Sequence, residues 1–95
     1  MLMKFKCKTQ GKTQGKTKLM ERRIRQNGIA YVYSLFRDRD GYSVQVIDLA
    51  GGRYVKCVLV DFTSDPVRAE DFFRLLVTHC VSAAHLTDVY EDEFP

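Results

Sequence analysis

The sequence predicts an α+β domain, in which a four-stranded antiparallel meander is followed by an amphipathic helix packed on one face and a short C-terminal helix. Three observations lead to this class. Apolar and polar residues alternate between residues 18 and 62, glycine-containing turns interrupt the alternation three times, and an apolar stripe with helical spacing follows. A chain of 95 residues has room for one such domain. We assign residues 1–18 to a disordered lysine-rich tail and residues 19–95 to the domain.

The first two expected strands, residues 18–26 and 29–36, flank Asn27-Gly28, a dipeptide typical of a type I′ hairpin turn. Alternation divides the second strand into two sets of side chains, both fairly apolar, which favours a central position in the sheet. These sets are Ile29, Tyr31, Tyr33 and Leu35 on one face, and Ala30, Val32, Ser34 and Phe36 on the other.

The third and fourth expected strands cover residues 42–49 and 54–62. A charged turn that ends at Gly41 precedes the third strand, and a turn containing Gly51-Gly52 separates it from the fourth. The fourth strand has one strongly apolar face and one that includes Lys56. We therefore expect one face of this sheet to be well buried and the other to be shared with solvent.

The expected first helix begins near Asp65-Pro66, because Thr63, Ser64 and Asp65 are N-cap candidates and proline suits the first helical position. Its apolar stripe consists of Ala69, Phe72, Phe73, Leu76, Val77 and Cys80. A second, short helix follows Ser82, with Leu86, Val89, Tyr90 and Phe94 at helical spacing. A fifth strand over residues 84–93 is the alternative, because Val89 and Tyr90 also suit a strand.

Charge is distributed unevenly along the chain. Residues 1–20 contain six lysines and no acidic residue, whereas residues 21–95 contain nine basic and twelve acidic residues. The repeated Thr-Gln-Gly-Lys of the tail has nothing to bury, so we expect disorder. Gly15-Lys16-Thr17 does not complete a phosphate-binding loop, because Gln10 stands where that motif requires glycine. Met20 is a second candidate for the start of the native chain, and a basic arm that touches nucleic acid or anionic lipid is the alternative role for the tail.

Several classes of protein are excluded. The longest apolar runs are four residues, too short for a membrane span or a signal-peptide core. Three cysteines without a C-x-x-C pair favour a reducing compartment, so we predict a cytoplasmic protein. The chain has no nucleophile elbow, no H-E-x-x-H pair and no glycine-rich loop between strand and helix. We therefore expect a protein that is not an enzyme and uses no cofactor.

Metal sites are also not expected. His85, Asp88 and Asp92 share one face of the last helix, but a single exposed helix provides little support for a metal, so a solvated face is the preferred interpretation. Cys80 lies beside His79, yet it belongs to the apolar stripe and is interpreted as a small core residue. A three-cysteine zinc site with Cys57 would require the tail to fold back and supply Cys7.

The favoured function is a protein-interaction or regulatory module with an unknown protein partner, a homodimer being a further arrangement. The evidence is the number of tyrosines, because a sheet covered on one face must leave some of them exposed. The alternative is binding of RNA or another single-stranded nucleic acid through a tyrosine and arginine sheet face and the basic tail. Whether these side chains share one open face discriminates the two. The candidate binding residues are Tyr31, Tyr33, Tyr42, Tyr54, Arg37, Arg39 and Arg53.

The second half of the chain resembles a known pattern. It consists of the capped start Ser64-Asp65-Pro66, the run Ala69-x-x-Phe72-x-x-Leu75, the joint Val81-Ser82 and the block His85-Leu86-x-Asp88-Val89-x-Glu91-Asp92. Residues 20–94 resemble a family of short uncharacterised proteins, a domain of unknown function, from Gram-positive anaerobic bacteria. Ala83 stands where family members often carry proline. The resemblance implies no activity, cofactor or partner.

Overall fold

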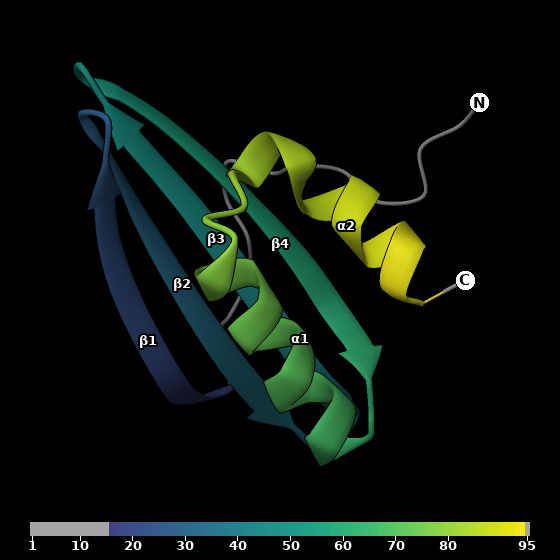
Figure 1. The fold of residues 1–95 in the computed structure, drawn as a ribbon. Coiled ribbons are helices and arrows are strands. Elements are labelled where there is room, and N and C mark those ends of the chain that lie inside the picture. The colour runs from purple at the N-terminus through teal and green to yellow at the C-terminus, as the bar shows by residue number, and fades with distance from the viewer. Residues whose placement is uncertain (1–15, 95) are drawn as a thin grey trace.

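A four-stranded antiparallel sheet with two helices on one side forms the protein in the computed structural model, which describes residues 16–94 (Figure 1). The elements are β1 (Thr17–Gln26), β2 (Ile29–Asp38), β3 (Gly41–Ala50), β4 (Arg53–Thr63), α1 (Pro66–Thr78), the 3-10 helix η1 (Ala83–His85) and α2 (Leu86–Glu93). The strands lie in the order β1-β2-β3-β4. The predicted α+β meander followed by two helices is confirmed.

The start of β1 lies earlier than the sequence pattern indicated. Thr17 already pairs with Arg37 of β2, and Lys16 forms an ion pair with Asp38. Residues 16–18 are therefore held by the sheet, which places the start of the domain three residues before the expected boundary at residue 19. The expectation of disorder for residues 1–15 lies outside the described residues.

The three turns follow the predicted backbone chemistry. Asn27 and Gly28 both have positive φ, at 52° and 80°, as a type I′ hairpin turn requires, and Gly51 and Gly52 repeat these values. Gly41 has a different reason to be glycine, because a Cβ atom there would lie 2.8 Å from the Thr63 carbonyl oxygen. The β2–β3 turn can therefore pack closely against the end of β4.

An irregularity in β4 decides where the last residues of that strand lie. Val44 pairs with Leu59 but Tyr42 pairs with Thr63, so β4 contains extra residues at this point. Asp61 has φ of 51°, and its N–H donates a 2.9 Å hydrogen bond to Ser43 Oγ. As a result Phe62 lies on the same side of the sheet as Leu59 and contacts Phe72 of α1, with 5.2 Å between ring centroids.

Helix α1 covers the central strands with its apolar stripe. Asp65 caps its start by accepting a 2.9 Å hydrogen bond from the Val67 N–H, and Pro66 occupies the first turn. The stripe buries Ala69, Phe72, Phe73 and Leu76. The helix ends at Thr78, and Cys80 lies beyond it in the left-handed conformation, at φ 48° and half-buried. The expectation that Cys80 continues the helical stripe into the core is thus wrong, because the chain reverses there to reach the sheet.

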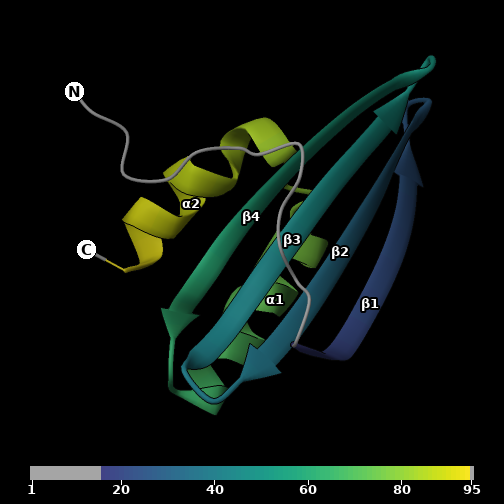
Figure 2. The same cartoon turned by 180° about the vertical axis from the view of Figure 1, so that it is seen from behind.

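The last segment is helical, so the alternative of a fifth strand is wrong. Leu86 is fully buried, and Tyr90 and Phe94 form an aromatic cluster with Phe62 and Phe72. Both helices lie on the same side of the sheet, α1 over the middle strands and α2 beside β4 (Figure 1). Seen from behind, no helix covers the strands (Figure 2).

Candidate functional site

Two of the predicted binding residues, Tyr31 and Tyr33, lie beneath α1 in the core. Their rings stack with centroids 6.2 Å apart, and the Tyr33 hydroxyl donates a 3.0 Å hydrogen bond to the Val81 carbonyl. Burial raises the pKa of the Tyr33 hydroxyl. The expectation that these rings are exposed on an open face is therefore wrong. Both sets of side chains on β2 are apolar, so alternation alone did not show which set faces the helix.

The other five predicted residues do not come together either. Tyr42 is half-buried and packs against the core, while Arg37 and Arg39 are exposed at the β2–β3 turn. Arg53 and Tyr54 follow the β3–β4 turn. In an antiparallel meander these two turns lie at opposite ends of the sheet, about 33 Å apart for strands of ten residues. The seven side chains thus form no single surface.

A different surface emerges from the strand register, on the side of the sheet that α1 does not cover. Two rows of side chains cross the sheet near the β1–β2 and β3–β4 turns. The first row is Arg25, Ala30, Leu49 and Tyr54, and the second is Arg23, Val32, Ile47 and Lys56. We call these eight residues the tip face. Tyr54 is the one tyrosine of the original prediction that it contains.

Apolar side chains are exposed in the middle of the tip face. Leu49 is 40% exposed and Tyr54 is 51% exposed, which is high for large apolar residues on a sheet. Between the two turns lies a depression of about 380 Å³, lined by Arg25, Ala30, Leu49, Arg53 and Tyr54 together with the turn glycines. The small side chain of Ala30 leaves this space between its larger neighbours.

The tip face is positively charged at its margins. Arg23 donates a 2.9 Å hydrogen bond to Glu21, which also accepts one of 2.5 Å from Lys18, and these bonds lower the pKa of the Glu21 carboxyl. Arg25, Arg53 and Lys56 form no ion pair within residues 16–94. Three cations without a partner thus surround an apolar centre, although acidic residues outnumber basic ones between residues 21 and 95.

Sequence reasoning missed this surface because its residues come from all four strands. The signal that could have found it was the register implied by Asn27-Gly28 and Gly51-Gly52. Two-residue turns align Arg25 with Ala30 and Leu49 with Tyr54 in the paired strands. Choosing which of the two faces stays open still required the position of α1.

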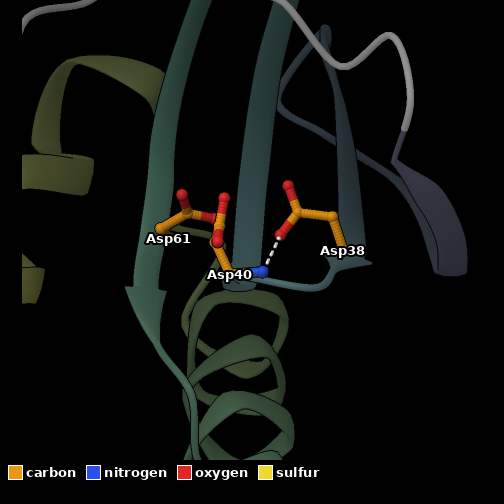
Figure 3. A group of neighbouring side chains, drawn as sticks. All are labelled: Asp38, Asp40 and Asp61. Atoms are coloured by element: carbon orange, nitrogen blue, oxygen red, sulfur yellow. Dashed lines mark hydrogen bonds between the residues drawn. The ribbon is translucent and has the colours of Figure 1, made fainter.

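An acidic cluster lies at the other end of the sheet, where Asp38, Asp40 and Asp61 approach one another (Figure 3). Their nearest carboxylate oxygens all lie within 4.8 Å of one another. Asp38 Oδ1 accepts hydrogen bonds of 2.8 and 3.1 Å from the N–H groups of Asp40 and Gly41. The sequence did not predict the group, because the irregularity in β4 brings Asp61 to it.

The chain itself supplies a cation to this acidic cluster. The Lys16 ammonium group is hydrogen-bonded to Asp38 and lies 3.6 Å from Asp61 Oδ1. The bond to Asp38 raises the pKa of Lys16, and the same bond lowers the pKa of Asp38. Lys16 therefore accounts for the clustering of these acids by tying the start of β1 to the ends of β2 and β4.

The histidine and acids of the C-terminal segment are arranged differently from a metal site. His85 Nδ1 lies 2.9 Å from Ser82 Oγ, and Asp88 is in the first turn of α2. Within residues 16–94, the aspartates near Lys16 are the one group with the proximity that a metal requires. Cys57 is buried and Cys80 half-buried, both as free thiols, and Cys7 lies outside the described residues.

Comparisons with known proteins give no match: no family model, no curated protein and no solved structure corresponds to this chain. The resemblance to an uncharacterised bacterial family therefore stays a prediction. None of the helices in the described part of the chain has the length and apolar character needed to cross a membrane.

Proposed function

We propose that this domain is a non-catalytic interaction module whose tip face binds an acidic and apolar segment of a partner protein. The observation that carries the proposal is the exposure of Leu49 and Tyr54 among three cations without an ion-pair partner in the described chain. Exposed apolar groups rimmed by polar residues mark interaction sites, and tyrosine and arginine contribute strongly to binding there. The tip face has neither a histidine nor a carboxylate to transfer protons, which favours binding over catalysis.

The chemistry of the tip face favours a protein over a nucleic acid. Single-stranded nucleic acids bind where several aromatic rings stack on bases, and Tyr54 is the one ring on this face. Its centre consists of Val32, Ile47 and Leu49, which pack against apolar side chains but offer no surface for base stacking. Arg37 and Arg39, which the nucleic-acid hypothesis included, lie at the far end of the sheet.

A homodimer through the tip face is also less favoured. In a two-fold symmetric contact the same patch meets itself, so Arg25, Arg53 and Lys56 would approach their own copies. An acidic partner avoids this repulsion. We place the interaction in the cytoplasm, where Cys57 and Cys80 would stay reduced as the free thiols they are here.

Selection of random peptides against the full chain tests this proposal. Peptides that bind are titrated into ¹⁵N-labelled protein, and we expect the largest shift changes at Arg25, Leu49 and Tyr54. The variant Leu49→Ser/Tyr54→Ser should weaken binding about tenfold or more, because it removes the exposed apolar centre. Peptides that shift other surfaces and tolerate this variant would contradict the proposal.

The matched control for this variant is Leu19→Ser/Val67→Ser. These two residues are 46% and 65% exposed, comparable with Leu49 and Tyr54, but lie away from the tip face. Binding should stay unchanged in the control. Mixed-sequence single-stranded RNA is titrated in parallel at two salt concentrations. Tight, salt-sensitive shifts at the tip face with RNA, and none with peptides, would replace the protein partner by a nucleic acid.

A further inference from the structure

We infer that the tip face binds an extended peptide with acidic residues at positions i and i+4 and an apolar residue at i+2. The inference rests on the proposed function and specifies the partner. It follows from the separation of the basic side chains, from the position of the apolar centre between them, and from the periodicity of an extended chain.

The separation comes from the sheet. Arg25 lies on β1, and Arg53 and Tyr54 lie on β4, so three strand spacings separate the two basic margins. At about 4.8 Å for each spacing, the margins are about 14 Å apart. An extended peptide advances about 3.3 Å per residue, so residues i and i+4 are about 13 Å apart. One carboxylate then meets Arg25 while the other meets Arg53.

The apolar centre lies halfway along this path. Ala30 and Leu49 are the two residues between Arg25 and Tyr54 in the row, and they line the depression of about 380 Å³. A side chain at i+2 reaches this depression, because alternate residues of an extended chain point to the same side. Residues i+1 and i+3 point away from the sheet, so their identity contributes little.

An α-helical partner fits the same spacing poorly. A helix rises about 1.5 Å per residue, so it spans 14 Å in about nine residues. Residues nine apart lie on opposite sides of a helix, because each residue turns the chain by about 100°. An α-helix therefore cannot present two carboxylates to Arg25 and Arg53 at this separation along one face.

The free guanidinium groups give the inference its charge specificity. Arginine binds a carboxylate through two parallel hydrogen bonds, and neither Arg25 nor Arg53 uses its group for an ion pair within the described chain. Lys56, in the next row of β4, adds a third positive charge beside Tyr54. A peptide with basic residues at i and i+4 would be repelled at both margins.

Two labelled peptides test the spacing with the full chain. The matched peptide contains Asp-Ser-Leu-Ser-Asp, and the shifted peptide contains Asp-Leu-Ser-Ser-Asp, which has the same composition and charge but points leucine away from the depression. Fluorescence anisotropy should show binding about tenfold tighter for the matched peptide. Equal affinity for the two peptides would overturn the inferred motif.

Charge reversal tests the role of the arginines. Arg25→Glu/Arg53→Glu should weaken matched-peptide binding at least tenfold, whereas Arg37→Glu/Arg39→Glu, with the same change in net charge, should bind like the unmodified chain. Arg25→Gln/Arg53→Gln, which keeps polar side chains, should lie between them and serves if charge reversal disturbs folding. Equal losses in both reversed pairs would show a net-charge effect and overturn the inference.

The two proposals fail separately. If selected peptides shift the tip face but the matched and shifted peptides bind equally, the motif is wrong and the interaction module stands. If no peptide, selected or designed, shifts the tip face, both are wrong.

Discussion

At the scale of single residues, two polar side chains on the helix-covered face hold the segment between α1 and α2 against the sheet. The Tyr33 hydroxyl donates to the Val81 carbonyl, and the Asp48 carboxylate accepts the Ala83 N–H at 3.0 and 3.2 Å. Val81 and Ala83 lie outside α1 and α2, so their backbone groups lack a helical partner. The sheet satisfies groups that would otherwise be buried without a hydrogen bond.

Tyr33→Phe tests the first of these bonds. The substitution keeps the ring but removes the donor, so the buried Val81 carbonyl loses its partner. We expect the free energy of unfolding to fall by about 1 to 3 kcal/mol, measured by urea denaturation. Tyr31→Phe is the matched control, because no hydrogen bond of its hydroxyl connects it to the C-terminal segment, and it should have a clearly smaller effect. Equal losses in both variants would contradict this role.

Asp48 predicts a pH dependence. Burial raises the pKa of its carboxyl above the ordinary value of 3.8, and the Ala83 N–H opposes this in part. The folded chain therefore holds this proton more tightly than the unfolded chain does. The contribution to stability is complete below the unfolded-state pKa and is lost as the pH rises through the folded-state pKa.

Asp48→Asn should remove this dependence, because asparagine keeps an oxygen that can accept the Ala83 N–H but carries no charge. We expect the unfolding free energy of the variant, relative to the original chain, to increase between about pH 3 and about pH 7. Urea denaturation across this range measures the difference. Asp71→Asn, at an exposed position of α1, provides the comparison. A difference for Asp48→Asn that stays flat with pH would show that the carboxyl does not contribute in this way.

At the scale of elements, α1 and α2 are joined to the sheet through aromatic packing. Phe72 contacts Phe62 of β4, Tyr90 of α2 and the C-terminal Phe94, with ring centroids 5.2 to 6.2 Å apart. Arg68 of α1 lies over the Phe94 ring at 4.2 Å and donates to the Glu93 carbonyl at 3.0 Å. Phe72 therefore connects three elements.

Phe72→Ala should lower the free energy of unfolding by about 2 to 5 kcal/mol, because it leaves a cavity where three aromatic rings meet. Leu76→Ala, which is fully buried one turn later, belongs to the same range. Val67→Ala, on the exposed side of α1, should have a small effect. Thermal and chemical denaturation measure these changes. An unchanged melting midpoint for Phe72→Ala or Leu76→Ala would be incompatible with α1 packing on the sheet.

At the scale of the whole molecule, charge is separated between the two ends of the sheet. Arg25, Arg53 and Lys56 lie near the β1–β2 and β3–β4 turns, whereas Asp38 and Asp61 gather at the other end with Lys16. This separation gives an acidic partner one preferred end. The tip face belongs to residues 23–56, so binding there does not depend on the lysines of the N-terminal segment.

Removal of residues 1–15 tests this independence. The shortened chain starts at Lys16, keeps the ion pair with Asp38 and lacks four lysines. Matched-peptide affinity should stay within about twofold, because the tip-face contacts are unchanged. If the N-terminal segment instead served as a basic arm for nucleic acid, its removal would reduce RNA affinity and its salt dependence, by up to about 0.7 in the logarithmic slope for each phosphate contact on a single strand. Lost peptide binding would contradict the tip-face assignment.

Local sequence determined the elements of this protein. Asn27-Gly28 and Gly51-Gly52 set two hairpins, Asp65-Pro66 set the start of α1, and the spacing around Phe72 set its buried stripe. Each signal depends on backbone dihedral angles and hydrogen bonds among residues close in sequence. They were therefore available without the fold, and the predicted strand and helix positions agree with the structure to within a few residues.

Only the tertiary structure decided which side of the sheet became the core and which became the tip face. Tyr31 and Tyr33 alternate with Val32 and Ser34, and both sets are suitable for burial, so the choice depended on where α1 packed. The irregularity in β4 reinforced that choice by moving Phe62 to the side of Phe72. It also brought Asp61 toward Asp38. These are contacts between residues far apart in the chain, whose energy depends on complementary shapes that no local pattern records.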